Sequence, residues 1–393
     1  MNLLFWQRPA PLPPVTLVGL PYAISGRGQH LRAIFRALNA VGIRPRVVNL
    51  RDGGGDLSDE ALAAAEDAYP GPGIRLFHLN GNEADWGREV LRGRSAKAFA
   101  AGHNIIFPAW ELPRYPRHWA RALDRYDEVW AATDFVYQSL RRARLKAPLH
   151  HIVNACQPHI EEPLPRAHFG LDEAEFLVLF PFDYYSWFTR KNPLAAIRVV
   201  DRVVDSNPNR RLRLVIKANH HAEGGGAPHI ELREMIARRA RHVTLIERPM
   251  DDNEAKSLIA CCDCLLSLHR SEGFGRTPAE AMFFGKPTIA TGWSGNMEYM
   301  NPRVSVPVRY RLVRVAPDAY LEWRRQRWAE PDEDHAVEAL SRLVRDPAEA
   351  RRLGEAGRRH MLRHFSDEVL GERYLARFRA IARASPKRRV WRS

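Results

Sequence analysis

Residues 264–291 read CLLSLHRSEGFGRTPAEAMFFGKPTIAT and predict a strand, a loop, a helix and a second strand. The apolar runs at both ends have the length and composition of buried strands. Between them, TPAE is typical of a helix start, with Thr277 as N-cap, Pro278 first in the helix and Glu280 as the reciprocal cap. A strand, a helix and a strand in this order form the unit from which parallel sheets are built.

The same unit recurs along the chain. Strand-like and helical runs alternate from Val15 to about residue 157, and again from Phe176 to the strand that ends at Thr291. This alternation predicts an α/β fold with two Rossmann-like, doubly wound parallel sheets that carry helices on both faces. Ligands of such sheets bind at the C-terminal ends of the strands and in the cleft between the two halves.

The pattern divides the chain into residues 1–165, residues 166–365 and a last segment, residues 366–393. Ser366 would cap a helix that has two acidic residues in its first turn. The helix carries an apolar stripe that needs a packing partner, and we expect it to return to the first domain. The stripe consists of Val369, Leu370, Tyr374, Leu375, Phe378 and Ile381. The chain ends in a basic tail.

Basic residues precede two of the expected helix starts in the second half. Arg190 and Lys191 come before Asn192, and Arg276 comes before Thr277. A cation opposes the positive end of a helix dipole by a few tenths to ~1 kcal/mol. Two such cases after strands of one sheet therefore predict a shared anion, because helix starts and basic side chains together bind phosphate. The alternative is that these long side chains point into solvent.

Two glycines and two glutamates lie in the same loop and helix start. Gly273 and Gly275 flank Phe274 and would let the backbone approach a ligand, although an ordinary turn explains them as well. Glu272 could face the cleft or be a solvated loop acid. Glu280 could contact a ligand or be only a helix cap.

Composition limits the class of protein. Of 393 residues, 45% are hydrophobic, which is enough for real cores, and no apolar run has the length of a membrane span. The N-terminal apolar patch is too short for a secretion signal, so we expect a cytoplasmic chain. The 60 Lys and Arg residues exceed the 46 Asp and Glu residues, giving a net charge of +14 that suits an anionic partner.

The basic residues are dispersed, so the sequence does not predict a nucleic-acid-binding site. Peripheral contact with an anionic membrane, at its inner face, stays open. The CCDC run at residues 261–264 lacks the paired spacing of a zinc site. No DxD motif is placed to bind a metal, and we expect neither a metal nor another cofactor.

The stretch HRSEGFGRTPAEAMFFGKPTIATGWSGNMEYM, residues 269–300, resembles the donor site of retaining GT-B glycosyltransferases of the "glycosyl transferases group 1" family. Its hallmark is a glutamate, seven residues and a second glutamate. Residues 181–200 resemble the same family's phosphate-binding strand and helix start, and residues 107–136 and 328–340 resemble a polysaccharide-building subgroup. The resemblance covers most of the chain and implies two domains that face each other across a cleft.

The resemblance also implies roles for the second domain. Glu272 would contact the hydroxyls of the donor sugar and act as the catalytic residue, with Gly273, Phe274 and Gly275 beside the sugar and phosphate. Further donor contacts would come from Arg190, Lys191, Arg276, Thr277 and Glu280, of which Lys191 would neutralise the diphosphate and Glu280 would bind the ribose. The family's usual arginine lies five residues before the matching lysine, where this chain has Ser186, so the basic pairing is altered.

The first domain would hold the acceptor. Gly26 and Gly28 lie in a loop, LPYAISGRGQH, that matches the family's glycine loop near the cleft. Trp110 and Glu111 follow a strand, where an aromatic ring can stack on a sugar and an acid can bind its hydroxyls. A core tryptophan beside a rim acid is the alternative.

These features predict a retaining, metal-independent glycosyltransferase that moves a hexose-type sugar from a nucleoside-diphosphate sugar to a glycan or lipid-linked acceptor in polysaccharide biosynthesis. Three other readings stay open. The chain could be a catalytically silent scaffold of the same fold, a sugar-nucleotide epimerase, or a basic nucleic-acid-binding protein.

Overall fold

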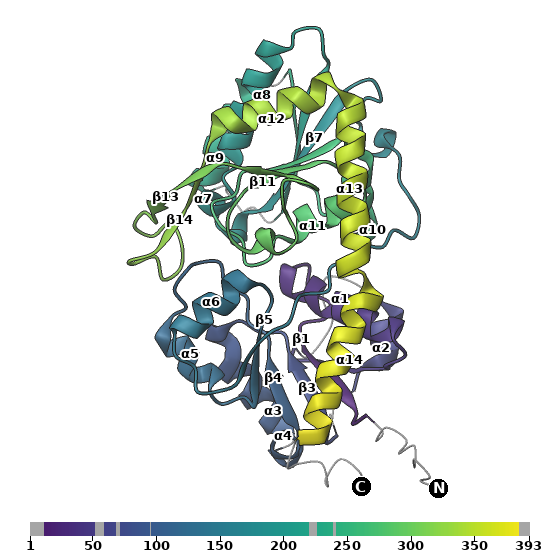
Figure 1. The fold of residues 1–393 in the computed structure, drawn as a ribbon, viewed down its shortest axis with the longest axis vertical. Helices are drawn as coiled ribbons and strands as arrows, with labels where there is room; N and C mark the ends of the chain where they lie inside the picture. The colour runs from purple at the N-terminus through teal and green to yellow at the C-terminus, as the bar shows by residue number, and fades with distance from the viewer. Residues whose placement is uncertain are drawn as a thin grey trace, which may run out of the picture.

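The computed structural model describes residues 12–51, 59–67, 71–94, 96–219, 226–238 and 241–384. The predicted basic tail, residues 386–393, and most of the N-terminal apolar patch lie outside the described residues. The described chain forms two α/β domains, one above the other in Figure 1.

The first domain is built on a six-stranded sheet in the order β2-β1-β3-β4-β5-β6. All neighbouring strands in it are parallel, as the alternating pattern predicts. Its strands are β1 (Val15–Gly19), β2 (Arg46–Asn49), β3 (Ile74–Phe77), β4 (His103–Ile106), β5 (Glu128–Ala131) and β6 (Leu149–His151). Its helices are α1 (Gly26–Ala40), α2 (Glu60–Ala65), α3 (Ala84–Arg94), α4 (Ala96–Ala101), α5 (Arg117–Leu123) and α6 (Asp134–Arg142), with a 3-10 turn at Gly81–Glu83.

The second domain carries another six-stranded parallel sheet, in the order β12-β11-β10-β7-β8-β9. Its strands are β7 (Phe176–Asp183), β8 (Leu212–Asn219), β9 (Val243–Ile246), β10 (Cys264–Ser267), β11 (Thr288–Thr291) and β12 (Val306–Val308). The helices before the C-terminal region are α7 (Phe188–Lys191), α8 (Pro193–Ser206), α9 (Ala227–Ala237), α10 (Asp252–Cys261) and α11 (Arg276–Phe283). Shorter 3-10 turns cover Arg166–Phe169, Tyr184–Ser186 and Gly295–Glu298.

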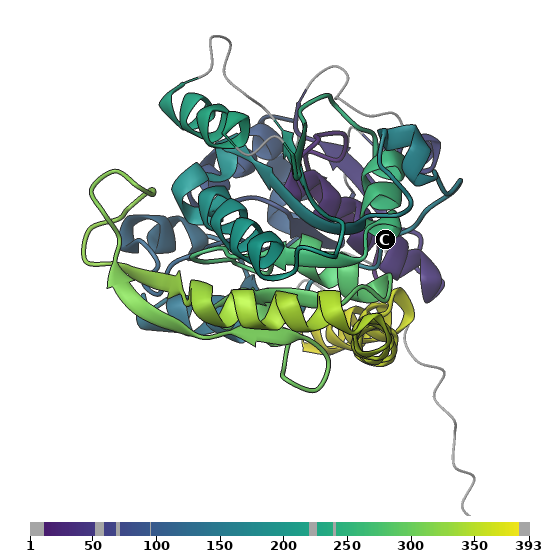
Figure 2. The same cartoon turned by 90° about the horizontal axis from the view of Figure 1, so that it is seen from above.

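The second sheet is covered on both faces. Along β7, Val178 and Phe180 belong to one buried cluster, which also contains α8 and α12 (Glu333–Arg345). Leu177 and Leu179 point the other way, into a cluster with α10. Because successive side chains of a strand face opposite sides, this division shows helices above and below the sheet, as Figure 2 shows from the end of the molecule.

The C-terminal helices join the two domains. After α12, helix α13 (Pro347–Phe365) runs along the second domain, and α14 (Asp367–Ala384) continues down the first (Figure 1). The ring of Tyr374 stacks on Trp130 of β5, with centroids 6.1 Å apart, and Arg377 pairs with Glu128 at 2.5 Å. The predicted return of the last helix to the first domain is therefore what the structure shows.

An antiparallel pair of strands extends from the second domain and was not predicted. β13 (Tyr310–Arg314) pairs with β14 (Arg327–Pro331), and we call residues 310–331 the arm. The arm reaches the first domain, where the Gln326 side-chain amide donates to the carbonyl of Arg114 at 2.7 Å. The arm comes after β12, the last strand of the parallel sheet in the chain. The alternation of strands and helices, which predicts parallel sheets, therefore does not predict it.

Two predicted helix starts were wrong. Helix α11 begins at Arg276 rather than Pro278, its N-cap is Gly275 with φ of 82°, and no side chain caps it. Thr277 is therefore not an N-cap, and the predicted capping box with Glu280 does not form. Gly26 lies not in a loop but at the start of α1, where Ser25 is the N-cap.

Candidate active site

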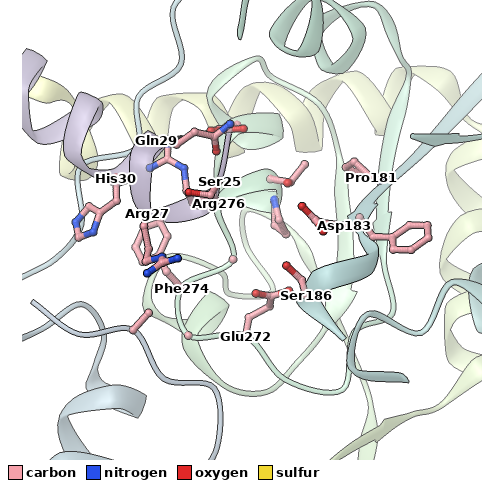
Figure 3. Close-up of a pocket in the computed structure, with 18 of the residues that line it drawn as sticks. Ser25, Arg27, Gln29, His30, Pro181, Asp183, Ser186, Glu272, Phe274 and Arg276 are labelled. Carbon is pink, nitrogen blue, oxygen red and sulfur yellow. Dashed lines mark hydrogen bonds and ion pairs between the residues drawn. The ribbon is translucent and has the colours of Figure 1, made fainter. Parts of the chain in front are cut away.

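A cavity of about 310 Å³ lies between the two domains. The first domain contributes the start of α1 and the segments after β3 and β4, and the second contributes the ends of β7 and β8, the loop after β10 and the start of α11. In Figure 3, Ser25, Arg27 and His30 lie on one side of the cavity, and Asp183 and Ser186 lie on the other. The cavity thus occupies the place that the fold predicts, at the C-terminal ends of the strands.

Glu272 lies in the loop after β10 and is buried at 8% exposure. Its backbone N–H donates to Oγ of Ser294 at 2.8 Å, and its carbonyl accepts from the N–H of Gly295 at 2.8 Å. These two bonds hold the loop against the segment that follows β11. Glu272 lines the cavity, so it faces the cleft and is not a solvated loop acid.

Two cations neutralise Glu272. Lys191 Nζ lies 2.5 Å from Oε1, and Arg190 Nη1 lies 3.2 Å from Oε2. Burial alone would raise the pKa of Glu272, but the charges of Lys191 and Arg190 lower it to about 2. The carboxylate is therefore ionised at neutral pH.

The two basic residues differ in access to the cavity. Arg190 is only 4% exposed and donates to the carbonyl of Ser271 at 2.7 Å, so it supports the loop that carries Glu272. Lys191 is more exposed, and both residues line the cavity. Asn192 follows them with φ of 61° and occupies the N-cap position of α8, but its side chain donates to the carbonyl of Leu268 at 3.0 Å instead of capping the helix.

The loop Gly273-Phe274-Gly275 also lines the cavity. The carbonyl of Gly273 accepts from Oγ1 of Thr133, in the first domain, at 2.9 Å. A Cβ at Gly273 would lie 2.8 Å from the carbonyl oxygen of Trp110, so only glycine lets the two domains approach here. Phe274 is buried in a cluster that contains residues of both domains.

Glu280 is almost fully buried, at 2% exposure, and lines the cavity. Oε2 pairs with Lys256 of α10 at 2.8 Å, and Oε1 pairs with Arg276 at 3.0 Å. Arg276 also donates to the carbonyl of Ala155 in the first domain at 3.2 Å. A cation at the positive end of a helix is therefore balanced by a carboxylate one turn along the same helix. Thr277 lines the cavity beside it.

Of the four residues predicted on the acceptor side, Glu111 and Trp110 differ in their access to the cavity. Glu111 lines the cavity, and its carboxylate accepts a hydrogen bond from the hydroxyl of Tyr320 in the arm. Trp110 does not line the cavity, so its prediction as a sugar-stacking residue was wrong. It is 2% exposed and its Nε1 donates to the carbonyl of Arg114 at 3.1 Å. Strand β4 ends at Ile106, and the chain turns inward before it reaches Trp110.

The start of α1 forms another wall of the cavity. Gly26 lines it, and the backbone N–H of Gly28 donates to Oγ of Ser25 at 3.3 Å. A Cβ at Gly28 would lie 2.2 Å from the carbonyl oxygen of Ala23, whereas a Cβ at Gly26 would meet nothing within 4 Å. Gly28 is therefore required by packing rather than by a direct ligand contact.

The sequence interpretation missed two histidines in the first domain. His78 directly follows β3, and His30 lies in α1; both line the cavity, with ring centroids 4.8 Å apart. Nδ1 and Nε2 of His78 and Nε2 of His30 have no hydrogen-bond partner among the described residues. Burial lowers the pKa of His78 to about 3, so its ring is neutral. The position of His78 immediately after a strand was the signal in the sequence.

Lys217, near the end of β8, also lines the cavity. Burial, and then the charge of Arg248, lowers its pKa to about 8. Among the described residues, no group of three or more His, Cys, Asp or Glu side chains could hold a metal ion. The same part of the chain contains no helix that is both long and apolar enough to cross a bilayer.

Comparison with known proteins finds glycosyltransferases that this chain resembles in sequence. Residues 183–368 match the model of the "Family 4 Glycosyltransferase in conflict systems". A segment is 29% identical, over 144 residues, to the alpha-1,3/1,6-mannosyltransferase ALG2 of Homo sapiens, and covers 36% of this chain and 30% of that protein. The chain thus matches less than a third of the length of this curated relative.

Solved structures match over nearly the whole chain. HepE of Anabaena, crystallised with UDP and glucose, has a TM-score of 0.67 at 14% identity and covers 94% of this chain and 100% of its own. The sucrose-phosphate synthase of Thermosynechococcus elongatus has a TM-score of 0.67 at 17% identity, with 95% and 100% covered. These likenesses show the fold. The match of residues 183–368, together with this GT-B fold, supports a group 1 glycosyltransferase.

Proposed function

We propose that the protein is a retaining, metal-independent glycosyltransferase. It would move a hexose-type sugar from a nucleoside-diphosphate sugar to a glycan or glycolipid acceptor in polysaccharide biosynthesis. One observation carries the proposal: Glu272 and Glu280 line the same interdomain cavity, and each is held by two cations.

The distribution of charge suits such a donor. Lys191 lies at the cavity wall beside Glu272. When the donor binds, the ammonium group of Lys191 would pair with the diphosphate as well. The backbone at the start of α11 would add N–H groups to the phosphate contacts. Glu280 would accept hydrogen bonds from the ribose hydroxyls, because Lys256 and Arg276 fix its carboxylate in place.

In the reaction, the bond between the anomeric carbon and the diphosphate oxygen breaks, and a bond from that carbon to an acceptor hydroxyl oxygen forms. The hydroxyl proton passes to the departing diphosphate, and attack from the leaving-group face retains the configuration. Lys191 would stabilise the negative charge that develops on the diphosphate. A lysine side chain would thus do what a metal ion does in metal-dependent enzymes. Glu272 would hold the sugar through its hydroxyls.

The names of similar proteins support a hexose donor. The HepE structure contains UDP and glucose, and the name of ALG2 describes a mannosyltransferase. The net charge of +14 supports contact with an anionic membrane surface, where a lipid-linked acceptor would lie.

A thermal-shift panel with UDP, GDP, ADP, CMP and dTDP tests the donor site first, because a ligand of the native state raises its apparent stability. We expect one diphosphate to stabilise the wild type, and Glu280→Gln to lose most of that shift. Glu175→Gln is the matched control, since Glu175 is also buried and paired with an arginine, Arg213, but does not line the cavity.

Product assays with the sugars of the selected nucleotide follow. Transfer with retained configuration, unaffected by a chelator, supports the proposal. A shift without transfer favours a silent scaffold of the same fold, and no shift with any nucleotide would contradict the donor site.

A further inference from the structure

A second pocket lies beside the interdomain cavity. It has a volume of about 260 Å³ and is lined by Trp187 of the second domain and by arm residues 318 and 320–324. It is slightly smaller than the interdomain cavity of about 310 Å³, so the chemistry of its lining rather than its size decides what it can bind.

The second pocket adjoins the interdomain cavity through two contacts. Ser186 lines the interdomain cavity, and the next residue, Trp187, lines the second pocket. Tyr320 lines the second pocket, while its hydroxyl donates to the carboxylate of Glu111, which lines the cavity. Arg190, whose guanidinium lies 5.8 Å from the ring centroid of Tyr320, connects this ring to Glu272. One layer of side chains therefore separates the two pockets.

The backbone around the second pocket is strained. Trp187 has φ of 67°, and Asp318 and Glu322 have φ of 54°. Non-glycine residues rarely adopt a positive φ, and those that do are concentrated at functional sites. Three of them line this one pocket. Trp187 also keeps 38% of its surface exposed, although a bulky aromatic residue gains stability from burial.

The lining has the chemistry that recognises a pyranose. The exposed ring of Trp187 provides an apolar face for the C–H groups of a sugar, and the buried ring of Tyr320 supports it, with centroids 5.3 Å apart. The carboxylates of Asp318 and Glu322 can accept hydrogen bonds from its hydroxyls. Trp323 donates from Nε1 to Oδ1 of Asp318 at 3.0 Å, which fixes one carboxylate in place.

We propose that the second pocket binds a sugar unit of the acceptor glycan, away from the unit that carries the reacting hydroxyl. The inference rests on the proposed function and adds that the acceptor is an oligosaccharide chain that contacts the arm. A longer acceptor would then bind more tightly, because sugar units away from the reaction centre add contacts in the second pocket.

The test titrates the full chain with gluco-, galacto-, manno- and N-acetylglucosamine oligosaccharides, from monosaccharide to tetrasaccharide, by saturation-transfer NMR and calorimetry. We expect the affinity for one series to rise with length. Trp187→Ala should lose roughly three- to tenfold in affinity for the longest member, and Trp187→Phe should recover most of it. Neither replacement is glycine, so both variants must still adopt the positive φ of 67° at position 187.

Trp86→Ala is the control, because Trp86 is 39% exposed, as Trp187 is at 38%, but lines neither pocket. The same preparations are tested for the nucleotide shift, which Trp187→Ala should leave unchanged. An affinity that does not grow with length in any series, or one that Trp187→Ala leaves intact, would overturn the proposal. A missing nucleotide shift in the wild type contradicts the donor site instead, so the two failures are distinguishable.

Discussion

The ammonium group of Lys191 lies 2.5 Å from Oε1 of Glu272, and both side chains line the interdomain cavity. The pair joins the short helix after β7 to the loop after β10, so two neighbouring strands of the second sheet place their charges together. Without a donor, the lysine neutralises the glutamate. On the proposed function, its charge would become available to the diphosphate of a bound donor.

Replacing Lys191 should therefore reduce transfer more than it reduces stability. We expect Lys191→Ala to lower kcat roughly 10²–10³-fold, the range seen when one preorganised charge-stabilising donor is lost. The fold should persist, because Arg190 still pairs with Glu272. Product assays and thermal melting check this, with exposed Lys146→Ala as control. A Lys191→Ala enzyme that keeps full kcat would show that the diphosphate is neutralised elsewhere.

Because of Glu272, the free energy of unfolding should depend on pH in the acid range. Its pKa falls from 4.5 to about 2 in the folded protein, because the nearby cations outweigh burial. The folded state therefore gains stability that is fully present above about pH 4.5 and is lost as the pH falls through about 2. Urea unfolding across this window should give a shallower pH slope for Glu272→Gln than for the wild type. Glu128 and Glu254, whose pKa values are also about 2, keep part of the slope in both proteins.

Two glycines at the start of α1 should respond oppositely to alanine. Gly28→Ala would bring Cβ within 2.2 Å of the carbonyl oxygen of Ala23, and we expect a loss of about 1–3 kcal/mol in the free energy of unfolding. Gly26→Ala meets open space and should be neutral or stabilise by up to about 1 kcal/mol. Chemical denaturation measures both. Equal effects would mean that the turn before α1 adjusts freely.

Lys217 should give nucleotide binding a pH dependence on the alkaline side. Its pKa falls from 10.5 to about 8 because it is buried, with a further contribution from Arg248. The side chain is charged below that pH and neutral above it, so the affinity for a nucleoside diphosphate should fall as the pH rises through about 8. Calorimetry on the wild type and on Lys217→Met measures this. The variant should bind more weakly at neutral pH and lack the alkaline fall; an identical fall in both proteins would assign it to another group.

Much of the fold follows from local sequence patterns. Apolar runs such as residues 176–182 and 212–219 form central strands of a parallel sheet, because their residues are buried on both faces. The stripe on the last helix predicted its return to the first domain, where Tyr374 and Phe378 are fully buried. The resemblance to a known family singled out the glutamates of the loop and of α11, and both line the cavity.

The sequence by itself determined the alternating strands and helices and the positions of Glu272, Glu280 and Lys191, because these depend on residues close together in the chain. Only the tertiary structure decided which way side chains point at strand ends and which distant charges meet. It buried Trp110, brought Lys256 to Glu280, and set Tyr320 of the arm against Glu111. These contacts join segments far apart in the sequence, and they form only when both sheets and the last helix pack together.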